Sequence, residues 1–167
     1  MRACLECKRK HGEIYPIDEV PPIEPPLHIN CRCTIEILEA ILAGSATTKG
    51  EEGADYYVAY HGKLPEYYVT KDDAENIHGW KSGKNTIVGK IPGKMIGGDV
   101  YDNDDFHLPS APGRIWYEAD INYISGARNS ERILYSNDGL IFVTYDHYKT
   151  FIEIVVLDRE EEEEENE

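Results

Sequence analysis

The expected secondary structure changes once along the chain, from helices to strands. Helical patterns come first, at Ala54–Tyr60 and Thr70–His78. After Arg114 the sequence turns into short stretches rich in aromatic and β-branched residues, which are typical of strands. These stretches are Ile115–Tyr123, Arg132–Tyr135, Leu140–Thr144 and Thr150–Val156. Helices followed by strands, without alternation, predict an α+β domain in which N-terminal helices pack on an antiparallel β-sheet.

Local signals support these boundaries. Thr70 can cap the second helix, Asp72 and Asp73 suit the positive end of its dipole, and Gly79 can end it. The run Ser136–Gly139 reads Ser-Asn-Asp-Gly, a strong hairpin signal between two predicted strands.

Composition divides the chain into four parts. We expect a cysteine-rich segment over 1–42, a Gly/Ser/Thr-rich linker over 43–53, a folded domain over 54–157 and a disordered acidic tail over 158–167. The net charge is −15, and the tail alone carries eight acidic residues against one arginine. The net charge on the rest of the chain, outside this tail, does not exclude a nucleic-acid partner for the domain. The tail itself suits either solubility or the binding of a partner.

Membrane insertion is not expected. No stretch approaches the roughly 18 to 20 apolar residues that span a bilayer, and the residues after Met1 lack the profile of a signal peptide. The localisation stays open. Export, if it occurs, would take place as part of a larger toxin or phage-derived protein.

The four cysteines form two close pairs near the start of the chain, Cys4-x-x-Cys7 and Cys31-x-Cys33. Two thiolate pairs can close the tetrahedral shell of a structural zinc ion, whereas disulfides and free thiols are the alternatives. With Lys10–Pro16 and Pro25–Thr34, these cysteines resemble the C-terminal motif of phage minor head (Mu F-like) proteins. The resemblance implies a larger phage-type head or delivery protein.

Ionisable residues in the predicted domain suggest a chemistry. Glu118 lies in the first predicted strand, Arg128 and Arg132 flank the second, His147 precedes the last, and Lys71 lies on the second helix. A carboxylate and an imidazole can act as base and acid, and guanidinium groups hold phosphates bidentately. Phosphodiester cleavage needs these groups together. Surface ion pairs are the alternative for each residue.

The segments around these residues resemble the barnase-like family of microbial guanyl-specific ribonucleases, from about residue 53 to residue 154. The segments that carry the resemblance are Tyr60–Pro65, Tyr68–Lys71, Gly79–Trp80, Pro92–Asp99, Gly113–Tyr123, Ser125–Ser136 and Thr144–Phe151. They occur in the same order as in the family and with nearly the same spacing. The spacing differs chiefly at Gly62.

The resemblance implies roles for the matching residues. Glu118 matches the general base and His147 the general acid. Lys71, Arg128 and Arg132 match the cations that bind the phosphate and stabilise the transition state.

The resemblance also assigns supporting residues. Asp99 and Asp120 match buried acids that orient the cations, and Tyr148 matches a tyrosine that lines the substrate site.

The base-reading loop departs from the family pattern. Its matching residues here are Asn103, Asp104 and Asp105. Asp105 keeps a carboxylate for guanine, one methylene shorter than the family's glutamate. Asp104 replaces an arginine, and a charge reversal near bound RNA would typically cost on the order of 1 kcal/mol.

The implied reaction is cleavage of RNA after guanine by transesterification, through a 2′,3′-cyclic phosphate. It implies no catalytic cofactor, and a barstar-like inhibitor as the partner of an active toxin. The acidic balance of this chain should weaken electrostatic steering of such an inhibitor. The alternative is a non-catalytic phage head, structural or binding protein that retains the ribonuclease scaffold.

Overall fold

The computed structural model describes residues 40–156. The predicted zinc site at Cys4, Cys7, Cys31 and Cys33 and the predicted acidic tail lie outside the described residues. Within them, residues 102–114 belong to a compact unit distinct from the one that contains residues 40–101 and 115–156. The larger unit is an α+β fold, as the sequence predicts.

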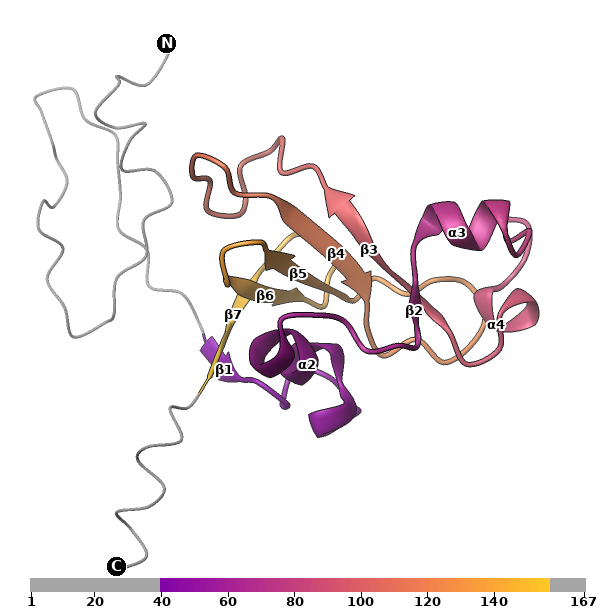
Figure 1. The fold of residues 1–167 in the computed structure, drawn as a ribbon, viewed down its shortest axis with the longest axis horizontal. Coiled ribbons are helices and arrows are strands. Elements are labelled where there is room, and N and C mark those ends of the chain that lie inside the picture. Colours follow the sequence, from indigo (N-terminus) through magenta and orange to yellow (C-terminus); the bar gives the residue numbers. More distant parts are fainter. Residues whose placement is uncertain (1–39, 157–167) are drawn as a thin grey trace, which may run out of the picture. The chain divides into compact units, whose positions relative to one another are not determined.

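The larger unit is built on one seven-stranded sheet (Figure 1). Its strands are β1 (Ala40–Leu42), β2 (Tyr68–Val69), β3 (Met95–Tyr101), β4 (Trp116–Asp120), β5 (Arg132–Ser136), β6 (Ile141–Thr144) and β7 (Ile152–Val155). Their order across the sheet is β1-β7-β6-β5-β4-β3-β2.

The sheet is mixed, which corrects the expectation of a purely antiparallel one. Strands β3 to β7 pair antiparallel, but β1 pairs parallel to β7 and β2 pairs parallel to β3 at the two edges. Both parallel edge strands are three residues or shorter. Segments of this length give too little periodicity for a prediction from sequence.

Short helices occupy the first half of the larger unit. They are the 3₁₀ turn η1 (Gly50–Glu52) and the α-helices α2 (Ala54–His61), α3 (Lys71–Asn76) and α4 (Ile87–Lys90). The two predicted helices are confirmed as α2 and α3. The Thr70 hydroxyl accepts a hydrogen bond from the Asp73 amide at the start of α3, as expected of a cap. Gly62, with φ +66°, ends α2 in the left-handed conformation that glycine adopts without strain.

The predicted hairpin between β5 and β6 is also confirmed. Gly139 takes φ +99° in the turn, and the Ser136 hydroxyl accepts a hydrogen bond of 2.9 Å from the Leu140 amide. This turn sets the register in which Arg132 lies opposite Thr144.

Side-chain alternation gives the central strands two different faces. Ala119, Ile133 and Val143 point to one face, where they form a buried core with Ala54 and Val58 of α2. Their neighbours along the strands point to the other face. That second face carries Glu118, Asp120, Arg132 and Thr144, all of them buried.

A second core cluster lies below α3 and α4. Trp80, Ile87 and Ile96 are each at most 2% exposed, and they pack with Ala74 and Ile91. The cluster anchors the start of β3, from which Asp99 is presented to the second face.

Residues 43–53, which the sequence predicts as a linker, are attached to the folded unit. The fully buried carboxylate of Asp55 accepts hydrogen bonds from the amides of Gly44 and Ala46 and from the Thr47 hydroxyl. The Tyr145 hydroxyl donates to the Ala46 carbonyl oxygen at 2.7 Å. A Gly/Ser/Thr-rich composition therefore serves tight turns around a buried acid here. No helix in the described part of the chain is both long and apolar enough to cross a bilayer.

Candidate active site

Glu118 is the central carboxylate of the second face. It lies in the middle of β4 with 8% of its surface exposed. Lys71 Nζ donates to Oε1 and the Tyr148 hydroxyl donates to Oε2, both at 2.5 Å. Burial raises the pKa of Glu118, but the hydrogen bonds from Lys71 and Tyr148 and the nearby positive charges outweigh it, so the pKa lies below its usual value.

Asp120 holds two arginines beside Glu118. Its carboxylate is 1% exposed and accepts two hydrogen bonds from Arg128, from Nε at 2.7 Å and from Nη2 at 2.6 Å. Arg132 Nε lies 3.0 Å from the same carboxylate, at ion-pair distance but without hydrogen-bond geometry. Burial lowers the pKa of Arg128, but the bonds to Asp120 reverse this effect and the net shift is upward. The acid thus keeps both guanidinium groups in place.

The two arginines are fixed differently. Arg132 lies directly opposite Asp120 across β4 and β5 and is 4% exposed. Its Nη1 donates to the carbonyl oxygens of Asn129 and Glu131. Arg128 lies in the loop between these strands, and its guanidinium keeps donors beyond the two that Asp120 uses. Arg128 is therefore the better placed of the two to bind a phosphate directly.

Asp99 positions Lys71 through the main chain. A β-bulge between Gly97 and Asp99 in β3 brings Asp99 opposite Glu118. Both carboxylate oxygens of Asp99 accept from the Lys71 amide, at 3.1 and 3.0 Å. Asp99 is half-buried, not buried as the sequence led us to expect. It orients the first residue of α3 and thereby the lysine side chain.

His147 and Tyr148 lie in a tight turn after β6. Both have positive φ, +61° and +65°, and their rings are 4.9 Å apart. The His147 amide donates to the Ser130 carbonyl oxygen at 3.1 Å. From this turn Tyr148 reaches Glu118, and the His147 ring contacts the ring of Tyr148.

Asp146 shapes that turn, and the sequence analysis missed it. Its carboxylate accepts from the amides of Lys149 and Thr150 and from the hydroxyls of Thr144 and Thr150. The hydrogen bonds from Thr150 are the main cause that lowers the pKa of Asp146 to about 2. An aspartate that precedes a threonine by four residues after a strand is typical of such a side-chain-stabilised turn, and this signal could have found it.

The predicted base-reading residues belong to the smaller unit, residues 102–114. The Asn103 side chain donates to the Leu108 carbonyl oxygen at 2.7 Å and accepts from the Leu108 amide at 3.0 Å. Asn103 therefore holds its own loop in shape. A hydrogen bond with Asp102 raises the pKa of Asp104. Asp105 is exposed.

Comparison with known proteins identifies the domain. A family model described as ribonuclease matches residues 51–155. The chain is 52% identical over 101 residues to a ribonuclease of Heyndrickxia coagulans, and the match covers 60% of this chain and 91% of that protein. This chain belongs to the ribonuclease family. Ribonucleases of Bacillus intermedius and Bacillus pumilus are also 52% identical over 101 residues, and the match covers 61% of each of them.

The family gives the chemistry of the site its context. The domain is barnase-like, and its substrate is RNA. The second face of this ribonuclease presents a buried carboxylate between a lysine and a tyrosine, an arginine pair on a shared acid, and a histidine in the adjacent turn. Among residues 40–156, no three His, Cys, Asp or Glu side chains are grouped as metal ligands.

Proposed function

We propose that this ribonuclease is an endonuclease of single-stranded RNA that works by acid–base transesterification without a metal ion. The observation that carries the proposal is the ionised, nearly buried Glu118 held by Lys71 and Tyr148 next to the arginine pair. A carboxylate in this setting can act as a base, and the neighbouring cations offset the repulsion between its negative charge and that of a phosphate.

In the proposed reaction, Glu118 removes the proton of the ribose 2′-hydroxyl, and the resulting oxygen attacks the neighbouring phosphorus. The bond to the 5′-oxygen breaks, and His147 protonates that leaving oxygen. Lys71, Arg128 and Arg132 stabilise the negative charge that develops on the phosphorane. The product is a 2′,3′-cyclic phosphate. Water then opens it more slowly, with Glu118 and His147 in exchanged roles.

Guanine preference is part of the proposal, with Asp105 reading the base and Asn103 holding the base-reading loop in shape. Both residues match the family's base-reading loop, and Asp105 can accept from the N1 and N2 donors of guanine. Asp104 acts against this by adding negative charge where the family has positive charge. We therefore expect a guanine preference weaker than that of relatives with arginine at this position.

The test uses short RNAs that differ only in the base 5′ to the scissile bond, cleaved in EDTA. Wild type should form a cyclic phosphate product, and Glu118→Gln and His147→Ala should each lose about 10²–10⁴-fold in kcat/KM. Glu75→Ala, which removes an exposed carboxylate on α3, is the matched control. Wild-type cleavage that stops in EDTA, or full activity of His147→Ala, would overturn the mechanism. A folded wild type without any activity would favour the non-catalytic scaffold.

We further propose that the domain is a toxin with an inhibitor partner. The cation-bearing second face offers an acidic, barstar-like inhibitor a complementary surface. Delivery and export would then depend on a larger phage-type protein. Titration calorimetry with products of adjacent genes tests the partner, and the absence of any association among them would remove it.

The zinc proposal concerns only the cysteine-rich segment. About one metal ion per chain is expected, lost when Cys4 or Cys31 is replaced by serine. Elemental analysis of protein purified under reducing conditions decides between bound zinc and the thiol alternatives.

A further inference from the structure

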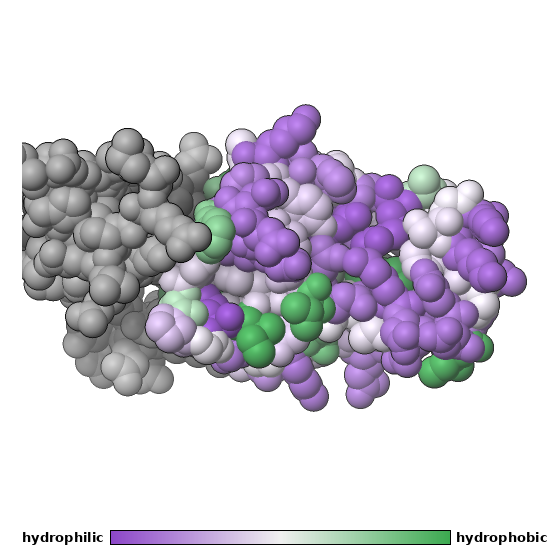
Figure 2. Space-filling view, turned by 90° about the horizontal axis from the view of Figure 1, so that it is seen from above, coloured by the Kyte–Doolittle hydropathy of each residue, from purple (hydrophilic) through white to green (hydrophobic). Residues whose placement is uncertain are grey.

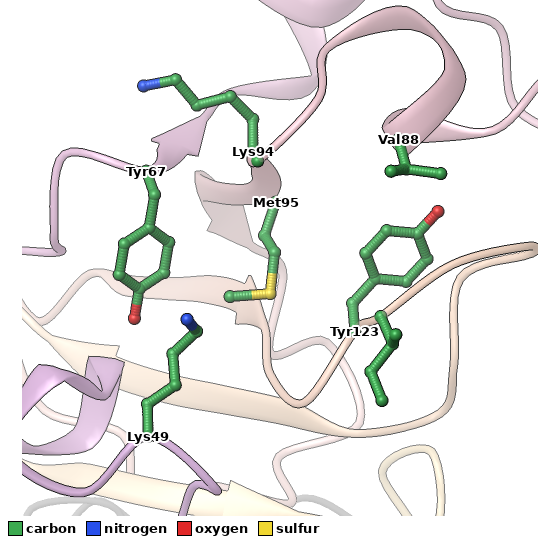
Figure 3. Close-up of a pocket in the computed structure, with 8 residues that line it drawn as sticks. Lys49, Tyr67, Val88, Lys94, Met95 and Tyr123 are labelled. Carbon is green, nitrogen blue, oxygen red and sulfur yellow. The ribbon is translucent and has the colours of Figure 1, made fainter.

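A small pocket lies outside the catalytic cluster, at the end of the sheet where β3 begins (Figure 3). Its volume is about 150 Å³. The rings of Tyr67 and Tyr123 stand on its two sides, and Met95 lies between them. Val88 and Ile124 complete its apolar wall.

Two lysines add positive charge to this pocket. Lys49 Nζ lies 4.8 Å from the centre of the Tyr67 ring, a cation–π contact. Lys94 Nζ donates to the Glu66 carbonyl oxygen at 2.5 Å, which uses one of the three donors of its ammonium group. In Figure 3 its side chain extends away from Met95. The pocket thus combines flat aromatic walls with cations at its edge.

The aromatic walls are held in place from outside the pocket. The Tyr67 hydroxyl donates to the Glu52 carbonyl oxygen at 2.7 Å, and the Tyr123 hydroxyl donates to the Gly126 carbonyl oxygen at 2.9 Å. Burial is the main cause that raises the pKa of Tyr67 to about 12. Rigid, neutral aromatic rings lose little entropy when a flat ligand stacks on them.

Exposed apolar side chains elsewhere are scattered, and most of the surface in Figure 2 is hydrophilic. Ile77, Val100 and Ile115 are exposed, but none of them lines the pocket beside Tyr67. Isolated apolar residues need no special explanation. Ile124 differs because it is 86% exposed at the edge of an aromatic pocket.

We infer that this pocket is a second RNA subsite, in which a purine base packs against Met95 and the rings of Tyr67 and Tyr123 that flank it, while Lys49 and Lys94 attract the adjoining phosphates. Single-stranded RNA is bound in this way, by base stacking on aromatic rings together with cations that follow the backbone. The inference rests on RNA being the substrate of the domain.

The chain connectivity joins the pocket to the catalytic cations. Met95 precedes the bulge in β3 that brings Asp99 opposite Glu118, which places it at least about 10 Å from Glu118 along the strands. The loop from Ile121 to Glu131 carries Tyr123 and Ile124 at one end and Arg128 near the other. An RNA strand that follows this loop can occupy both the pocket and the site around Glu118. A dinucleotide can occupy only one of these two sites.

The probe is a 2′-O-methyl hexa-adenylate, which cannot be cleaved because its 2′-oxygens are blocked. It is titrated into the full chain with Met and Ile methyl groups observed by NMR. Saturable shifts are expected at Met95 and Ile124. Ile124→Glu places a negative charge at the rim and should weaken the Kd of the hexamer about tenfold, the loss of roughly one stacked base.

Ile77→Glu is the matched control, because Ile77 is 69% exposed and does not line the pocket. It changes the net charge equally and should alter the Kd less than twofold. Lys49→Gln, at an exposed lysine, should lower the slope of log Kd against log salt by about 0.7. Equal losses in both glutamate variants, or shifts confined to residues around Glu118, would overturn the subsite.

Cleavage of a dinucleotide by wild type is measured in parallel. A wild type that cleaves the dinucleotide but shows no shift at Met95 or Ile124 refutes the subsite and leaves the proposed function standing. A wild type that fails to cleave but shows these shifts supports the subsite and refutes the proposed function.

Discussion

Asp55→Ala tests whether residues 43–47 are an integral part of the ribonuclease fold. The Asp55 carboxylate is fully buried and accepts three hydrogen bonds, of 2.7 Å from the Gly44 amide, 2.9 Å from the Ala46 amide and 2.9 Å from the Thr47 hydroxyl. Alanine removes the acceptor for all three. The segment must then either detach or keep unpaired polar groups buried.

The magnitude follows from these bonds. A hydrogen bond to a charged group contributes about 1.5–3 kcal/mol net. If the segment detaches, the three released donors form hydrogen bonds with water instead. The sum of the three contributions is therefore an upper limit. We expect Asp55→Ala to lower the free energy of unfolding by about 3–5 kcal/mol. Asp55→Asn keeps an oxygen for the two amides and should cost about 1–2 kcal/mol.

Urea denaturation followed by tryptophan fluorescence measures both variants. Loss of 3–5 kcal/mol should lower the urea midpoint by about 2 M. Thr47→Val should destabilise wild type by about 1 kcal/mol but have almost no effect in the Asp55→Ala background, because its partner is gone. Glu75→Ala is the control for loss of an exposed carboxylate. If Asp55→Ala costs no more than Glu75→Ala, the buried acid does not hold the segment, and the reasoning fails.

Three further changes test the site and the sheet. Tyr148→Phe removes one hydrogen-bond donor that lowers the pKa of Glu118. The acidic limb of the pH profile of kcat/KM should therefore move to higher pH. An unchanged limb would contradict this account. The pKa of Asp146 is lowered to about 2, so its contribution to stability is present above pH 4 and lost as the pH falls toward 2. Asp146→Asn should flatten this dependence in acid denaturation and reduce kcat through the turn, and an unaltered acid midpoint would refute it. In Gly97→Ala, the new Cβ would lie 2.4 Å from the Cβ of Ala119, so thermal unfolding should occur at clearly lower temperature. Ala119→Gly should partly restore the double variant, and strict additivity would exclude this contact as the cause.

The two faces of the sheet explain why several of the predicted site residues lie together. Glu118 and Asp120 share a face because they are two residues apart on one strand. Their relation to Arg132 follows once β4 and β5 pair. The residue types came from a resemblance that spans most of the domain. The geometry came from the structure, including the two hydrogen bonds from Arg128 and the ion pair from Arg132 that share Asp120.

The predictions that hold depend on local interactions. The start of α3 at Thr70, the end of α2 and the turn at Gly139 are decided within about four residues, by a cap or by a positive φ. Such effects can be recognised from sequence because all their participants are adjacent. The predicted order of helices before strands holds only for β3 to β7, because β1 precedes the helices and β2 lies between α2 and α3.

The remaining features depend on contacts between distant parts of the chain. The parallel pairing of β1 with β7 joins Ala40 to Glu153, and the buried Asp55 turns an apparent linker into part of the fold. Short segments without periodicity carry no signal for such contacts, since their stability comes from the partner they meet. The sequence alone determined helices α2 and α3, the hairpin and the family. The tertiary structure decided the parallel edges, the bulge that brings Asp99 to Glu118, and the pocket beside Tyr67.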